Sequence, residues 1–207
     1  MNIRLLKYFF ITALLLSNIL ATKIINVGGL LLPAAIILYP LTFLVTDVVG
    51  EVQGKKSAQS LVMAGFYMSF FMVLALCIAR WLPAAPFWDH GEAWDAILGA
   101  TPRIVMASMI AYLVSQTHDV WAFHWWRDKT EGRHLWLRNT ASTVLSQGID
   151  TVLFITIAFG GLYAWADIAT MVGSQYLVKV VIAVLDTPLC YLLVRYYGNT
   201  GEHIQGS

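Results

Sequence analysis

The sequence predicts an all-α membrane protein with six transmembrane helices and both termini in the cytoplasm. Of its 207 residues, 58% are hydrophobic and only 12% are charged, whereas soluble domains average about 25% charged residues. Six spans of about 20 residues with short links would use nearly the whole chain. We therefore expect a single six-helix domain over residues 1–197 and a short disordered tail at 198–207.

The hydrophobic runs are divided by charge clusters and by glycine or proline. The dividers are NVGG, QGKKS, LPAAPFWDHGEAWDAILGATP, RDKTEGRH and GGLYAWAD. Between them, helices are predicted at residues 5–25, 31–51, 58–81, 103–126, 135–161 and 169–195. Arg4 and Lys7 precede the first run, as in a secretory signal. The run continues through Asn18 without a small-residue cleavage site, which favours a retained helix.

Basic residues set the expected orientation, because lysine and arginine gather on the cytoplasmic side of a membrane. They gather here at the amino end, the second loop, the fourth loop and the carboxyl end, as Arg4, Lys7, Lys55, Lys56, Arg127, Lys129, Arg133, Arg138 and Arg195. The third loop instead carries Asp89, Glu92 and Asp95. Arginines occur only at its rims, at Arg80 and Arg103, so this loop suits a partly ordered external cap.

Several function classes lack their sequence signatures. The formal net charge is only +1 and no basic tract occurs, so no nucleic-acid partner is predicted. Cys77 and Cys190 each lie alone in an apolar run, which predicts neither a disulfide nor a zinc site. The histidines lack metal-ligand spacing, and no HExxH or GxSxG motif occurs. We expect no metal, no cofactor and no enzyme activity; an intramembrane enzyme with paired carboxylates is the less supported alternative.

The pattern S-Q-x-x-D-x-x-x-F occurs twice, 31 positions apart, as SQTHDVWAF and SQGIDTVLF. Within each copy the amide, the carboxylate and the aromatic ring share one helix face. A short loop makes the two helices antiparallel neighbours, so these faces can meet across one cavity. The residues concerned are Gln116, Asp119 and Phe123 in the fourth predicted helix and Gln147, Asp150 and Phe154 in the fifth.

Other charged residues also lie at membrane depth. About 12 to 18 Å from the cytoplasmic basic edge lies a layer of carboxylates, namely Asp47, Asp119, Asp150 and Asp186. Lys23 and Lys179 lie about 24 Å from that edge. A charge at the centre of a spanning helix costs about 2.5 to 3.5 kcal/mol, and such residues usually face a bundle interior or a wet cavity. Ion pairing that only holds the bundle together is the alternative, but buried pairs seldom stabilise enough for that role alone.

The chemistry of these side chains fits a flat, guanine-like base. A carboxylate such as Asp119 or Asp150 accepts two parallel N–H bonds, and a glutamine amide both donates and accepts. Phe123 or Phe154 could cover the face of the base, although each could equally be a packing residue. Pro40 and Pro188 interrupt helices beside acidic residues, where a cavity can satisfy the freed carbonyl groups.

Five segments carry a family resemblance: SNILATK, YPLTFLVTDVVGEVQGKK, RIVMASMIAYLVSQTHDVWAF, LWLRNTASTVLSQGIDTVLF and YLVKVVIAVLDTP. They resemble the queuosine-precursor transporters, also called the vitamin uptake transporter family, over most of residues 17–190. The resemblance implies a multi-pass protein of the prokaryotic inner membrane. It also implies import of 7-cyano-7-deazaguanine and 7-aminomethyl-7-deazaguanine, precursors used in tRNA modification.

By motif position, the resemblance carries a set of polar residues onto this chain, namely Asn18, Lys23, Asp47, Glu51, Gln116, Asp119, Gln147, Asp150, Lys179 and Asp186. We expect Asn18, Lys179 and Asp186 in the substrate site with the two repeated motifs. Lys23, Asp47 and Glu51 are expected in coupling or gating, because Asp47 and Glu51, four apart, could share a proton.

Three questions stay open at this level. A substrate-capturing subunit of an energy-coupling-factor importer is an alternative function, since that class also has about six helices and roughly 200 residues. Proton coupling and facilitated diffusion are both consistent with the sequence. Apart from the small-molecule substrate and membrane lipid, the one further partner considered is a second copy, which small residues in the spans would permit without requiring it.

Overall fold

The computed structural model describes the backbone of residues 3–129 and 135–199. Side chains are described over the same ranges except at residues 119–120, 122–129, 135–143, 183–188, 190–191 and 198–199. Within this part the chain is mostly helical, as predicted for an all-α membrane protein.

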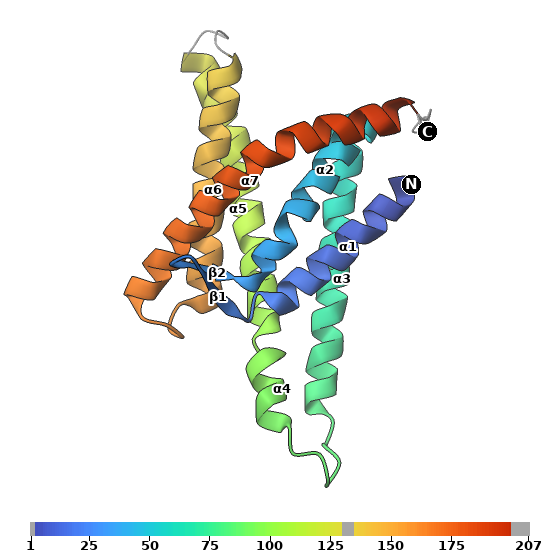
Figure 1. The fold of residues 1–207 in the computed structure, drawn as a ribbon, viewed down its shortest axis with the longest axis vertical. Helices are drawn as coiled ribbons and strands as arrows, with labels where there is room; N and C mark the ends of the chain where they lie inside the picture. Colours follow the sequence, from blue (N-terminus) through green and yellow to red (C-terminus); the bar gives the residue numbers. More distant parts are fainter. Residues whose placement is uncertain (1–2, 130–134, 200–207) are drawn as a thin grey trace.

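The described part of the chain contains six helices of 15 residues or more, and each overlaps one predicted helix. They are α1 (Ile3–Leu20), α2 (Tyr39–Gln53), α3 (Lys55–Trp81), α5 (Thr101–Lys129), α6 (Leu135–Phe159) and α7 (Trp165–Asn199). Figure 1 shows α5 and α6 side by side and antiparallel, with α7 running obliquely across the bundle. The short helix α4 (Gly91–Ile97) lies in the long third loop and is tied to the end of α3 by an Arg80–Asp95 ion pair of 2.9 Å.

The predicted helix at 31–51 is wrong in its first third. Strands β1 (Ile24–Val27) and β2 (Leu30–Pro33) form an antiparallel hairpin there, followed by a 3-10 turn, η1 (Ala34–Ile37). Gly28 and Gly29, with φ of 59° and 88°, form the two-residue turn, a conformation that favours glycine. Apolar residues on both sides then pair as strands, so α2 begins only at Tyr39.

Two buried clusters show how the helices are directed. One joins Ile3 of α1, Val48 of α2, Leu61 of α3 and Tyr197 of α7, so the starts of α1 and α3 meet the ends of α2 and α7. The other cluster joins the end of α1 to the starts of α5 and α7 and the end of α6. The six long helices therefore run in alternating directions along the chain, and the start of α1 and the end of α7 lie at the same end of the bundle (Figure 1).

Three stretches among the described residues are long and apolar enough to cross a membrane, namely Ile3–Leu20, Lys55–Trp81 and Gly91–His118. The apolar stretch Val144–Phe159 is shorter. Helix α2 has 15 residues, or about 22 Å of helix, which is less than the roughly 30 Å of a bilayer core. The hairpin and η1 therefore occupy the part of the predicted helix at 31–51 that α2 does not cover.

Candidate functional site

A cavity of about 150 Å³ lies among the helices. A cavity of this size can hold a benzene-sized ring. Its wall includes residues of α1, α2, α3, α5, α6 and α7 and the irregular segment at 33–36, and most of the wall is apolar. The aromatic residues on it are Phe10, Tyr39, Phe43, Phe66, Tyr112 and Phe154. Non-helical backbone at membrane depth is tolerated where it is buried in protein or lines a cavity, and the segment at 33–36 lines this one.

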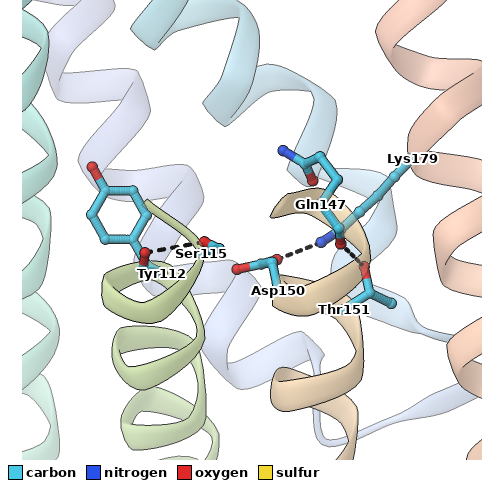
Figure 2. A network of polar contacts seen from close by, with 6 residues as sticks. All are labelled: Tyr112, Ser115, Gln147, Asp150, Thr151 and Lys179. Atoms are coloured by element: carbon cyan, nitrogen blue, oxygen red, sulfur yellow. Dashed lines mark hydrogen bonds and ion pairs between the residues drawn. The ribbon is translucent and has the colours of Figure 1, made fainter. Parts of the chain in front are cut away.

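A buried ion pair forms part of the cavity wall. The Lys179 ammonium lies 2.6 Å from one carboxylate oxygen of Asp150, and their side chains are 4% and 16% exposed (Figure 2). The other carboxylate oxygen points away from Lys179 in the same view. Asp150 lines the cavity and Lys179 lies behind it, so the carboxylate can accept further bonds while its charge is balanced.

Tyr39 completes this group of residues. The Lys179 ammonium lies over the Tyr39 ring, 4.9 Å from the ring centroid. Tyr39 begins α2 directly after the 3-10 turn, and it also lines the cavity. The hairpin and 3-10 turn that precede α2 therefore position an aromatic ring beside the ion pair.

Asn18 occupies the α1 side of the cavity. It is 6% exposed, and its amide donates a hydrogen bond of 3.2 Å to the hydroxyl of Ser69 on α3, which is 1% exposed. Phe154 lines the cavity from α6, with its ring edge-on to Phe159 at 6.2 Å. Asn18, Asp150, Phe154 and, through its ion pair, Lys179 are thus the sequence-predicted residues that the structure brings together here.

Five other predicted residues lie elsewhere. Gln116 is exposed, and Gln147 is half-buried outside the cavity wall. Lys23 is exposed in the turn between α1 and the hairpin. Asp47 and Glu51 are exposed on α2.

The side chains of the three remaining predicted site residues, Asp119, Phe123 and Asp186, lie outside the described residues. The placement of these three side chains around the cavity therefore stays a prediction.

A histidine of the first repeated motif contacts the serine of the second. His118 Nδ1 lies 3.1 Å from the hydroxyl of Ser146, which joins α5 to α6. Ser115 and Ser146 are both 6% exposed. Part of the repeat therefore serves contact between two antiparallel helices.

Sequence reasoning missed Tyr39, Ser17 and Gln175, all of which line the cavity. Gln175 follows Ser174 in a third Ser-Gln pair, in the segment SQYLVK, and lies one helical turn before Lys179. That third Ser-Gln pair could have indicated Gln175 as a candidate site residue. The oxygens of Ser17 and of the Gln175 amide are buried and have no hydrogen-bond partner among the described residues. Leaving such a group unsatisfied costs about 1 to 3 kcal/mol.

An apolar helical bundle that encloses a cavity with a charged pair in its wall is typical of membrane transporters for small molecules. Residues 33–193 match the family model described as "Putative vitamin uptake transporter". This chain belongs to that family of transporters.

Two curated relatives have related descriptions. The "Probable queuosine precursor transporter" of Bacillus subtilis (strain 168) is 30% identical over 187 residues, covering 88% of this chain and 80% of its own length. The "Queuosine precursor transporter" of Escherichia coli (strain K12) is 27% identical over 157 residues, which cover 74% of this chain and 67% of its own. No solved structure matches the chain.

Proposed function

We propose that this protein imports 7-deazaguanine precursors of queuosine across the inner membrane, and that residues 1–197 act as one transport domain. The observation that carries the proposal is the Asp150–Lys179 pair in the wall of an aromatic-rich cavity, in a chain of this family. The relatives named as queuosine precursor transporters support the choice of substrate.

The wall offers the groups that a flat, guanine-like base needs. The Asp150 carboxylate can accept the ring N–H and the 2-amino group in parallel, one on the open oxygen and one on the second lone pair of the oxygen that Lys179 binds. Phe154 of α6 and Phe66 of α3 each supply aromatic surface to the cavity wall. Asn18 adds an amide that can bind a ring substituent.

The proposed topology has six spans with both termini in the cytoplasm. Alternating helix directions place Arg4, Lys7, Lys55, Lys56 and Arg195 near one end of the bundle. The acidic third loop and α4 lie toward the other end (Figure 1). Basic residues mark the cytoplasmic side, so the first end would face the cytoplasm, with the hairpin and η1 completing the second span.

The direct test is uptake of radiolabelled 7-cyano-7-deazaguanine into liposomes that contain only the purified protein. Accumulation above protein-free liposomes supports transport without separate motor subunits. An imposed pH gradient that increases the initial rate would indicate proton coupling, and an unchanged rate would indicate facilitated diffusion. Absence of uptake and of binding by correctly folded protein would contradict the proposal.

A further inference from the structure

The cavity wall contains two polar groups that the proposed binding mode does not use. Gln175 on α7 and Ser17 on α1 both line the cavity. Each residue is 6% exposed, and neither the amide oxygen of Gln175 nor the hydroxyl of Ser17 has a hydrogen-bond partner among the described residues. Buried polar groups in proteins are nearly always hydrogen-bonded, so each such exception needs an explanation.

Gln175 lies beside the ion pair. It precedes Lys179 by four residues on α7, so the two side chains share one helix face, and Lys179 binds Asp150 of α6. The residues of the cavity wall therefore include two separate acceptors, the Asp150 carboxylate and the unpaired amide oxygen of Gln175. A ligand that satisfies both must carry N–H donors on two different edges.

A 7-deazaguanine free base meets this requirement. Its N1–H and 2-amino group form one donor edge, which suits the Asp150 carboxylate. Its five-membered ring carries a second N–H, and the ring nitrogen N3 beside that N–H is an acceptor. This donor and acceptor match an amide oxygen and a hydroxyl hydrogen, the groups that Gln175 and Ser17 present.

We propose that Gln175 and Ser17 determine the specificity of the site for the free base, an inference that rests on the proposed function. The Gln175 amide oxygen accepts the N–H of the five-membered ring, and the Ser17 hydroxyl donates to N3. A nucleoside or any other base substituted at that ring nitrogen has lost the N–H, so Gln175 stays unsatisfied when it binds. The same residue then selects the free base over its glycosylated form.

The test combines one variant with one substrate analogue. Uptake of radiolabelled 7-cyano-7-deazaguanine into liposomes is competed with the unlabelled compound and with its N9-methyl derivative. For the wild type we expect the methyl derivative to compete at least about tenfold more weakly, as for one buried hydrogen bond. Gln175→Leu should weaken the unmethylated competitor about tenfold and remove the difference between the two compounds.

The matched control is Ser174→Ala, because Ser174 is 5% exposed, adjacent to Gln175 and absent from the cavity wall. This variant should keep the wild-type difference. A second variant, Ser17→Ala, should weaken competition by the parent base but not by an analogue that has carbon in place of N3. It tests the same site if Gln175→Leu does not fold.

The outcomes separate the two levels of the proposal. Wild-type protein that transports the base but does not discriminate against the methyl derivative overturns the role of Gln175 and leaves the transport function standing. The same holds if Gln175→Leu folds and discriminates as the wild type does. If Ser17→Ala weakens the parent base and the analogue with carbon in place of N3 equally, the role of Ser17 is overturned. Wild-type protein that fails to transport the base at all overturns the proposed function itself.

Discussion

Asp150 and Lys179 depend on each other because each is a charged group held largely away from solvent. Removing one partner of a buried pair leaves the other charge uncompensated, at a cost of about 3 to 5 kcal/mol, whereas replacing both with apolar groups is often neutral. Single and double variants of the pair therefore separate what Asp150 and Lys179 contribute to stability from what they contribute to substrate binding.

We predict that Asp150→Asn and Lys179→Met each lower the thermal unfolding temperature and abolish uptake. The double variant should regain most of the lost stability, because no lone charge remains, but it should not regain uptake. Thermal unfolding in detergent and liposome uptake measure the two properties. Uptake restored together with stability would show that the pair is structural only.

Asn18 is predicted to act partly through Ser69. Asn18→Ala leaves the Ser69 hydroxyl buried without its partner, which should cost about 1 to 3 kcal/mol of stability. Ser69→Ala should cost less in the Asn18→Ala background than in the wild type, as a double-mutant cycle in chemical denaturation would measure. Additive losses would mean that the hydrogen bond contributes nothing to the coupling of α1 and α3.

At the level of single residues, helical spacing gives positions along one helix but not the neighbours on other helices. The distance of Asp150 and Lys179 from the basic edge could be counted along each helix, but which side chains meet depends on how the helices cross. Gln116 and Gln147 share the motif of Asp150, yet neither lines the cavity, and the recorded bond between the two motifs joins His118 to Ser146. Gln175 lines the cavity because α7 passes beside it; the third Ser-Gln pair marks the residue but does not indicate how α7 crosses the other helices.

Among the elements, the hairpin between α1 and α2 differs most from the sequence-based prediction. The helical interpretation followed the long apolar run after residue 30, whereas Gly28 and Gly29 between apolar residues are a hairpin signal. Helix α1 ends at Leu20, before the predicted end at residue 25, because the chain turns there into β1; the other four long helices follow their predicted ranges more closely. Hydrophobicity predicts that a segment is buried but does not distinguish a strand from a helix over so few residues.

The hairpin turn provides a prediction at this scale. Gly29→Val places a β-branched residue at a φ of 88°, which should destabilise the protein by about 1 to 2 kcal/mol although no atom lies within 4 Å of the added Cβ. Gly173→Ala, in the helix α7 and also in open space, is the matched control and should be neutral or stabilising. Equal unfolding temperatures for both variants would argue against the hairpin.

Arg103 gives a second prediction, because its guanidinium donates to the carbonyl groups of Ile157 and Gly160 at the end of α6. Arg103→Met leaves two terminal carbonyl groups without these donors and should lower the unfolding temperature by several degrees. Arg80→Met removes only the exposed pair with Asp95 and should change stability by about 1 kcal/mol or less. A larger effect at Arg80 would contradict this assignment.

For the whole molecule, the proposed orientation can be measured by chemical labelling. In a background with Cys77→Ala and Cys190→Ala, we expect Asp89→Cys to react with a membrane-impermeant maleimide on intact cells. Lys56→Cys should react only after the membrane is permeabilised, because the second loop is assigned to the cytoplasm. The reverse pattern would invert the topology, and labelling of both positions in intact cells would contradict six spans.

Helix α7 has 35 residues, or about 52 Å of continuous helix, and it contacts the buried clusters at both ends of the bundle. Lys179 and Gln175 lie near its middle. A rigid helix that rotates about its centre moves its two ends in opposite directions. A small change in the tilt of α7 at the ion pair would therefore loosen the packing at one end of the bundle and tighten it at the other. A single rotation of this helix could then expose the cavity to one side at a time.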